Sequence, residues 1–275
     1  MSPQPPAKEL QKLYSREKGY YATVETDLSR IPASANEWLH ALLKQVHTPG
    51  KQFLDVGCAN GQLMYHMNSF GWNVCGVDIN PDTVSIARSN GLDARCGTLQ
   101  ESSLPAGSFH AIHLGDVIEH VPSPGGMLAR VFELLQSRGI VVIRTPNNQN
   151  GYARLTTILS QVTGMAWTQS EAPYHLFEFS AKSLSQLLTR HGFVVVSSAS
   201  SGRSSFTYRI GATGYFDELK RTIKHREKRR GRNFLWQLPR LMCTGLLLAP
   251  FYGAGSLVSA LTGQKDSLLV VARKP

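Results

Sequence analysis

Cysteine is scarce in this sequence, with four residues among 275. The four (Cys58, Cys75, Cys96 and Cys243) are far apart, and none belongs to a Cys-x-x-Cys pair or a zinc-finger spacing with histidine. A disulfide framework and a zinc module are therefore both disfavoured, and a reducing cytoplasm is expected. The first ten residues also lack an apolar run, so neither a secretory signal nor an N-terminal anchor is expected.

Acidic residues are in deficit, and the formal net charge is +10. The excess is local, because residues 203–240 hold 11 Lys or Arg against 3 Asp or Glu. The rest of the chain therefore carries a net charge of only about +2. A strongly basic protein suggests nucleic acid as a partner, but here the charge belongs to one segment and not to the whole fold.

Apolar runs alternate with helical patterns along most of the chain, which predicts an α/β fold with a Rossmann-like, doubly wound, seven-stranded and mainly parallel sheet. Residues 1–50 are predicted to form an N-terminal helical cover, and residues 203–265 a basic and apolar helical insertion between the last two strands. The sheet domain would comprise residues 51–202 and 266–275. Strands are predicted at residues 52–56, 73–77, 93–96, 110–115, 139–144, 194–198 and 267–272, and the main helices at 61–70, 81–89, 124–136 and between Ser180 and Gly192.

The segment FLDVGCANG, residues 53–61, is the sharpest motif. Gly57 and Gly61 allow a tight strand-to-helix turn that approaches a ligand closely. Asp78 ends the next predicted strand, 21 residues after Gly57, where a carboxylate can accept both hydroxyls of an adenosyl ribose. A dinucleotide fits less well, because Ala59 breaks the Gly-x-Gly-x-x-Gly pattern. Asp55 would also repel a pyrophosphate, whereas it would attract a methionine ammonium group.

These motifs resemble the class I S-adenosylmethionine-dependent methyltransferases, in particular their ubiquinone-biosynthesis-like branch of small-molecule methyltransferases. The resemblance runs over residues 20–193 and resumes at 266–275. Members read Leu-Asp-Val-Gly-Cys-Gly-x-Gly, so Ala59 replaces the middle glycine. The resemblance implies that S-adenosylmethionine is the cofactor, and that its methionine end is lined by Asp55, Gly57, Cys58, Ala59 and Gly61.

The resemblance also places the adenosyl half of the donor. Asp78 and Ile79 would hold the ribose and the adenine. Thr98 and Leu99 stand where members often have Asp-Ala beside the adenine ring, so an acceptor for the adenine amino group is lost there.

Residues 107–121 resemble the fourth-strand motif of the same branch. Gly115 and Asp116 would close over the sulfonium, and Glu119 and His120 would follow at the carboxyl edge of the sheet, where ligands bind. His175 lies in a second family-like segment, PYHLFEF. His120 and His175, beside Glu119, are candidate bases for an acceptor hydroxyl, although a hydrogen bond to backbone would explain either histidine equally well.

A metal site is the alternative interpretation of the same residues. Asp116, Glu119, His120 and His175 mirror an acidic-x-x-Glu-His plus His pattern with which some relatives hold a divalent metal, here a minority interpretation. His113, inside a predicted buried strand, is expected to be structural. The Asn-Pro-Pro-aromatic motif of amine methylation is absent, so an oxygen acceptor is favoured.

The predicted insertion combines a basic run, residues 221–232, with 21 uncharged residues at 241–261. A single membrane crossing would separate the last strand from the sheet. Attachment to an anionic membrane surface is therefore favoured, with a small-molecule or lipid-linked acceptor. A buried helical subdomain is nearly as plausible, and RNA or protein methylation, or donor binding without turnover, are further alternatives. The sequence does not indicate an oligomeric state.

Overall fold

The computed structural model describes residues 25–32, 34, 36–149, 153, 175–201 and 265–275. The chain divides into two compact units, of which the first comprises residues 1–145, 172–199 and 269–275. The second comprises residues 146–171 and 200–268, and most of it lies outside the described residues. Residues 203–264 of the predicted insertion lie outside the described residues. They include its basic run, residues 221–232, and its uncharged run, residues 241–261.

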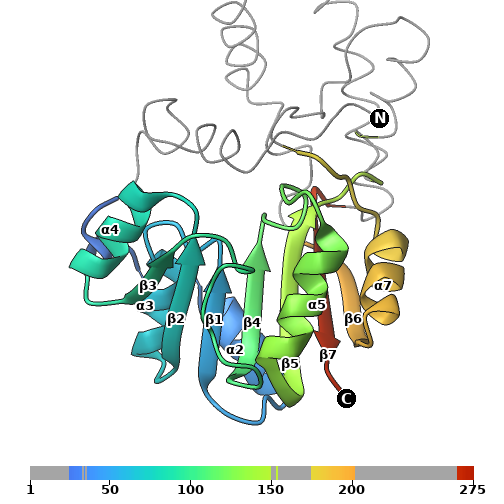
Figure 1. The fold of residues 1–275 in the computed structure, drawn as a ribbon, viewed down its shortest axis with the longest axis horizontal. Coiled ribbons are helices and arrows are strands. Elements are labelled where there is room, and N and C mark those ends of the chain that lie inside the picture. Colours follow the sequence, from blue (N-terminus) through green and yellow to red (C-terminus); the bar gives the residue numbers. More distant parts are fainter. Residues whose placement is uncertain (1–24, 33, 35, 150–152, 154–174, 202–264) are drawn as a thin grey trace, which may run out of the picture. The chain divides into compact units, whose positions relative to one another are not determined.

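A seven-stranded sheet forms the centre of the fold, with strand order β3-β2-β1-β4-β5-β7-β6 (Figure 1). The strands are β1 Gln52–Val56, β2 Asn73–Asp78, β3 Asp93–Cys96, β4 Phe109–Gly115, β5 Leu135–Pro146, β6 Val194–Ser201 and β7 Ser267–Arg273. The helices are η2 Leu28–Arg30, α2 Glu37–Gln45, α3 Gln62–Ser69, α4 Pro81–Ser89, α5 Pro124–Leu134 and α7 Ala181–Arg190. The predicted fold class is confirmed.

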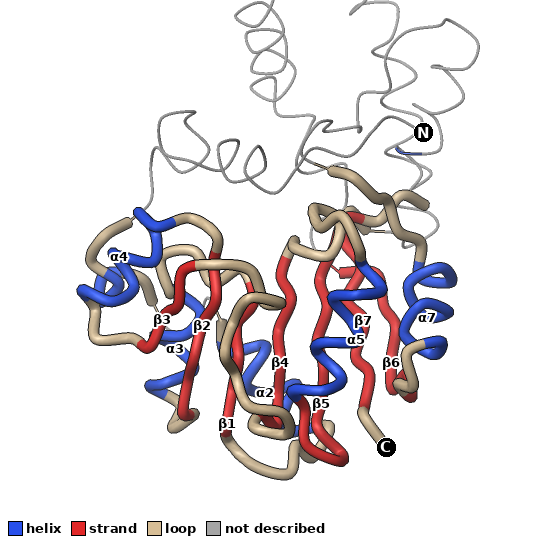
Figure 2. The backbone as a smooth tube through the Cα atoms, viewed as in Figure 1, coloured by secondary structure: helices blue, strands red, loops and turns tan. Residues whose placement is uncertain are grey.

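Strands β3, β2, β1, β4 and β5 run parallel to their neighbours. Strand β7 runs opposite to β5, since Lys274, just after β7, exchanges backbone hydrogen bonds of 3.0 and 2.9 Å with Arg138 and Gly139 at the start of β5. Because the central strands are parallel, the loops that follow β1, β2 and β4 gather at one edge of the sheet (Figure 2). That edge is where an open α/β sheet binds its ligands.

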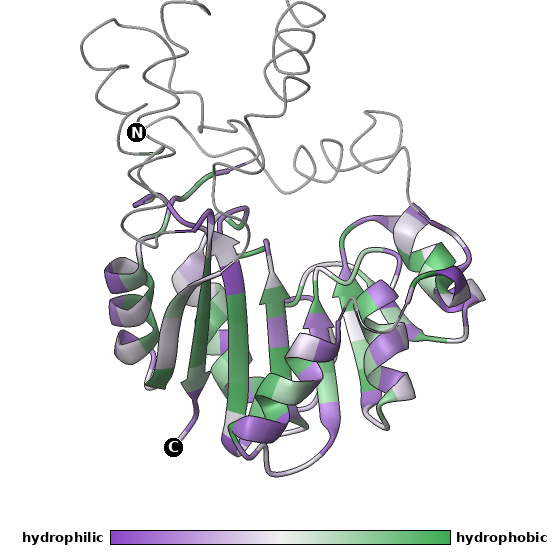
Figure 3. Cartoon of the chain, turned by 180° about the vertical axis from the view of Figure 1, so that it is seen from behind, coloured by the Kyte–Doolittle hydropathy of each residue, from purple (hydrophilic) through white to green (hydrophobic). Residues whose placement is uncertain are grey.

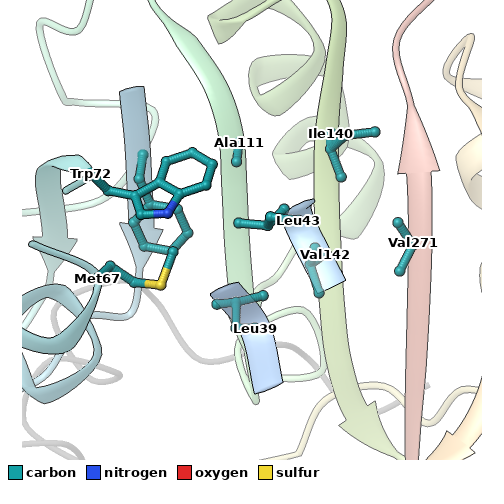
Figure 4. Close-up of a cluster of buried hydrophobic side chains, with 9 residues drawn as sticks. Leu39, Leu43, Met67, Trp72, Ala111, Ile140, Val142 and Val271 are labelled. Carbon is teal, nitrogen blue, oxygen red and sulfur yellow. The ribbon is translucent and has the colours of Figure 1, made fainter. Parts of the chain in front are cut away.

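Helix α2 packs on the face of the sheet opposite to α5 (Figures 1 and 3). Leu39 and Leu43, one helical turn apart, are fully buried and join a cluster with side chains of β1, β4 and β5, among them Ala111 and Val142 (Figure 4). The central strands are mostly apolar but are interrupted by hydrophilic residues, and the helices carry both hydrophilic and hydrophobic residues (Figure 3). The cluster therefore fixes the spacing of the strands whose ends carry the site.

One boundary differs from the prediction at the end of α5. The helix was expected to continue to residue 136, but it ends at Leu134, and Leu135 is already extended, with φ −73° and ψ 141°. Leu135 pairs with Phe109 of β4, and the register shifts between Phe109 and Ala111. Leu135 is fully buried in the strand, and a buried leucine fits an inward helical position equally well, so its hydrophobicity could not reveal where the helix stops.

Replacement of Leu43 by alanine should lower the free energy of unfolding by about 2–5 kcal/mol, because a fully buried leucine leaves a cavity when it is truncated. Lys44→Ala on the same helix is the matched control, since Lys44 is exposed, and should stay within about 0.5 kcal/mol of the unmodified chain. Urea unfolding measures both. Equal losses in the two variants would contradict the assigned orientation of α2.

Candidate functional site

The turn after β1 is built from left-handed backbone. Gly57, Ala59 and Gly61 have φ values of 75°, 48° and 82°. The Gly57 N–H donates to Val77 O of β2 at 2.8 Å, and the Gly61 N–H closes the turn on Cys58 O at 2.8 Å. Left-handed backbone costs a non-glycine residue about 1–2 kcal/mol, which explains why glycine is the commoner residue at the position of Ala59 in the family that the motif resembles.

Close packing also requires glycine in this turn. A Cβ on Gly57 would lie 2.4 Å from Val117 Cγ2, and one on Gly61 would lie 2.6 Å from Leu92 Cδ1. The turn is therefore wedged between the end of β4 and the loop before β3. Backbone held this close to neighbouring elements presents a fixed surface to a ligand.

Asp78 ties the turn to the end of β2. Its Oδ2 accepts the Ala59 N–H at 2.9 Å, and its Oδ1 accepts the Asn80 N–H at 2.8 Å. Burial raises the pKa of this carboxyl group, since the side chain is shielded from water, while the two backbone hydrogen bonds act in the opposite direction. Each carboxylate oxygen has capacity for a second hydrogen bond, as a vicinal diol requires.

Cys58 contributes to the turn through its backbone. Its thiol is buried, and burial together with the nearby Asp55 carboxylate raises the pKa of the thiol far above its ordinary range. Burial therefore makes this thiol a poor nucleophile, because the thiolate is the reactive form.

Thr98 and Leu99 follow β3 at the same edge of the sheet, and Leu99 is buried. The Glu101 carboxylate accepts hydrogen bonds from Thr98 Oγ1 at 2.7 Å and from Thr98 N–H at 3.0 Å. These bonds lower the pKa of Glu101, and the bond from the Thr98 side chain has the largest effect. Sequence reasoning missed Glu101, although an acidic residue three positions after Thr98 in a turn was the available signal.

Asp116 begins the loop after β4 with a left-handed φ of 54°. Its N–H donates to Arg144 O of β5 at 2.8 Å, and its carboxylate forms an ion pair with the Arg144 guanidinium. Asp116 is one of the four residues of the minority metal interpretation, and it pairs with Arg144 and is not part of the cluster formed by the other three residues.

Glu119, His120 and His175 do come together. Their ligand-type atoms all lie within 4.8 Å of one another. The His120 and His175 rings meet edge to face with centroids 4.7 Å apart, and His120 Nε2 lies 3.9 Å from Glu119 Oε1. The main chain brings the distant segment in, since Leu176 N–H and Phe177 N–H both donate to Glu119 O, at 2.8 and 3.0 Å.

The Glu119 side chain is almost completely buried. Its Oε2 accepts a hydrogen bond from Thr145 Oγ1 at 3.0 Å, whereas Oε1 has no hydrogen-bond partner within the described part of the chain. Burial raises the pKa of Glu119 to about 8, so the neutral acid predominates at pH 7.

His113, which was expected to be structural, pairs with Asp55. Its Nδ1 lies 2.9 Å from Asp55 Oδ1, and both side chains are buried. Sequence reasoning missed the pair. The signal that could have revealed it is the parallel register that sets Asp55 opposite His113.

A family model described as a methyltransferase domain matches residues 21–198, which is more than half of the chain. The chain belongs to the class I S-adenosylmethionine-dependent methyltransferases. The predicted family is thereby confirmed.

Curated relatives of this methyltransferase include the ubiquinone biosynthesis O-methyltransferases of Xanthomonas campestris pv. campestris (strain B100), 31% identical over 147 residues, and Xanthomonas oryzae pv. oryzae (strain PXO99A), 29% identical. Each alignment covers 45% of this chain and 62% of the relative, so the chain spans less than two thirds of their length.

Solved structures agree on the fold. A putative sarcosine dimethylglycine methyltransferase from Galdieria sulphuraria superposes with a TM-score of 0.54 at 16% identity, covering 88% of this chain and 85% of that one. A methyltransferase from Archaeoglobus fulgidus gives 0.54 at 16% identity, covering 87% and 94%. Within the described ranges of the methyltransferase, no helix has the length and hydrophobicity to span a membrane.

The stability of the methyltransferase should depend on pH through Glu119. Below about pH 4.5 the group is protonated in both the folded and the unfolded chain. Between about pH 4.5 and 8 only the unfolded chain loses the proton, so the free energy of unfolding falls as pH rises. Above that window both states are ionised and the loss is complete.

Glu119→Gln removes this dependence while keeping the shape of the side chain. From pH 5 to pH 8 the variant should gain on the order of 2–4 kcal/mol of stability relative to the unmodified chain. Urea unfolding in EDTA-containing buffer measures the difference, with Glu37→Gln at an exposed site as control. A difference that stays constant across this pH range would refute the assignment.

Proposed function

We propose that the protein transfers the methyl group of S-adenosylmethionine to an oxygen atom of a small-molecule or lipid-linked acceptor. The observation that carries the proposal is the buried Asp78 carboxylate, which is held by two backbone N–H groups beside the left-handed turn of residues 57–61. A fixed turn and a carboxylate beside it suit an adenosyl donor that carries no phosphate.

The donor fits the chemistry of the residues present. Asp78 would accept the ribose hydroxyls, while Ile79 and Leu99 would flank the adenine. The Glu101 carboxylate beside Thr98 supplies an acceptor for the adenine amino group in place of the aspartate that relatives often have there. Asp55 and Asp78 would both repel a pyrophosphate, which argues against a dinucleotide.

The turn residues and the end of β4 would hold the rest of the donor. Gly57, Cys58, Ala59 and Gly61 would contact its methionine end through backbone, and Gly115 and Asp116 would lie near the sulfonium. The ion pair with Arg144 gives the Asp116 carboxylate a defined position from which to do so.

The acceptor class is supported by two observations. The curated relatives are named ubiquinone biosynthesis O-methyltransferases, which suggests a small molecule methylated at oxygen. The cluster of Glu119, His120 and His175 offers bases at the edge of the sheet where such an acceptor would meet the donor.

In the proposed reaction the donor supplies an electrophilic methyl group on a sulfonium. The chain's part is to align the acceptor oxygen with the carbon–sulfur bond, which accounts for much of the rate. His120 or His175 would take the acceptor's proton as the new oxygen–carbon bond forms and the carbon–sulfur bond breaks. Glu119, kept neutral by burial and with Oε1 3.9 Å from His120 Nε2, would place no negative charge near the departing proton.

A divalent metal is the second interpretation of the same cluster. One carboxylate and two imidazoles suit Zn²⁺ or Mn²⁺, and a bound metal would lower the pKa of an acceptor hydroxyl. The unpartnered Glu119 Oε1 favours this interpretation, since a cation would satisfy it. The Asp116–Arg144 pair weighs against it, since it leaves the cluster with a single carboxylate.

The partner surface rests on sequence alone. Residues 221–232 would contact anionic headgroups and bring the enzyme to a lipid-linked acceptor at the cytoplasmic face of a membrane. An RNA acceptor would use the same basic run as a recognition patch, and acceptor fractionation separates the two.

Asp78→Ala should weaken binding of S-adenosylhomocysteine at least tenfold, because the ribose loses its acceptor and the turn loses its anchor. Isothermal titration calorimetry measures the binding. The same variant should fail to transfer labelled methyl into fractionated host extract. Asp82→Ala, an exposed aspartate in the first turn of α4, is the matched control and should behave like the unmodified chain. Turnover that survives Asp78→Ala unchanged would exclude the donor assignment, and label in RNA or protein would replace the acceptor class.

His120→Ala should lower kcat by roughly 10²–10⁴-fold, the typical contribution of a general base. His191→Ala, at the end of α7, should leave kcat unchanged. We expect EDTA to leave methyl transfer intact. Loss of transfer on chelation, with recovery on addition of Mn²⁺ or Zn²⁺, would assign the cluster to a metal instead.

A further inference from the structure

Asp55 and His113 form a buried pair at the seam between β1 and β4. They occupy paired positions in the parallel register, and Nδ1 of the imidazole lies 2.9 Å from Oδ1 of the carboxylate. Only 5% of the Asp55 side chain and 9% of the His113 side chain are exposed to solvent. An ionised carboxylate can only accept hydrogen bonds, so the Nδ1 atom must carry the hydrogen.

The other ring nitrogen of His113 is the unusual feature. Its Nε2 is buried and finds no hydrogen-bond partner among the residues that the structure describes. Buried polar atoms nearly always have a partner, and an exception calls for an explanation such as a bound ligand. In a neutral ring whose Nδ1 is protonated, Nε2 is an acceptor and would receive a hydrogen bond from a ligand N–H.

The position of the ring shows where such a ligand would lie. A Cβ on Gly115 would fall 2.5 Å from His113 Cε1 and 3.2 Å from Nε2, so this edge of the ring extends over Gly115 at the carboxyl end of β4. Asp55 stands two residues before Gly57, the first left-handed residue of the turn. The unpartnered nitrogen therefore belongs to the edge of the sheet that would bind the donor. Trp38 of α2 covers the ring from another side, with centroids 6.5 Å apart.

We propose that His113 Nε2 accepts a hydrogen bond from the α-ammonium group of the donor, with Asp55 supplying the opposing negative charge. The inference rests on the proposed function and adds a binding residue to it. An ammonium group is a donor of up to three hydrogen bonds and carries no acceptor, which matches one imidazole acceptor beside a carboxylate. The neutral ring is the binding form, because an imidazolium would repel the ammonium.

His113→Asn tests the Nε2 atom by itself. The asparagine amide nitrogen can take the place of Nδ1 and donate to Asp55, but the side chain has no atom at the position of Nε2. His113→Gln is the partner variant, because its terminal amide reaches that position and can present an oxygen acceptor there. Thermal unfolding of both variants reports whether the fold is retained.

The ligands form a matched pair as well. S-adenosylhomocysteine carries the α-ammonium group, and its deamino analogue differs by that group alone. 5′-Methylthioadenosine keeps the adenosine and the thioether and lacks the whole amino-acid end. Calorimetric titration of the full chain with all three ligands measures the dissociation constants.

We expect His113→Asn to weaken S-adenosylhomocysteine binding about tenfold and to leave the two ligands without an ammonium group within twofold. His113→Gln should recover part of the loss. Equal weakening of all three ligands by His113→Asn would show a structural role, and no weakening of any would show that Nε2 makes no contact; either result overturns the inference. Failure of the unmodified chain to bind any of the three would overturn the proposed function itself, a result distinguishable from both.

Discussion

The Asp78 carboxylate joins the end of β2 to the turn that follows β1, and the geometry of the proposed donor site depends on this link. Its hydrogen bonds from Ala59 and Asn80 hold two loops in one position, and a Cβ added to Gly57 or Gly61 would meet a neighbouring side chain. The carboxylate is buried among these groups, so its desolvation cost is offset by backbone donors that stand ready before a ligand arrives.

Two groups of ionisable side chains lie at the edge of the sheet. Asp55 of β1 and His113 of β4 form a hydrogen-bonded pair next to the proposed site for the methionine end of the donor. Beyond β4, a cluster is formed by Glu119, His120 and His175. Burial keeps the carboxyl group of this cluster protonated at neutral pH. One carboxyl group is thus hydrogen-bonded to a histidine, and the other is kept neutral by burial.

The sequence predicted the parts that follow from local pattern. Alternating apolar strands and helices indicated the doubly wound sheet, and the glycine turn with Asp78 indicated the adenosyl donor. The prediction of the sheet is confirmed, and because its central strands are parallel, their carboxyl ends meet at one edge. The end of α5 was missed, since a buried leucine such as Leu135 fits the core side of a helix as well as a buried strand.

The sequence could not predict which side chains far apart in the chain form pairs. No local pattern distinguishes Asp116 from Glu119. In the structure, the register of β4 and β5 pairs Asp116 with Arg144, while Glu119 lies beside His120. His113 reads as a core residue until the β1–β4 register sets it against Asp55. The sequence by itself determined the fold and the donor turn, because both arise from residues near one another in the chain. Only the tertiary structure decided which charged groups meet, because strand register and burial bring together side chains dozens of residues apart.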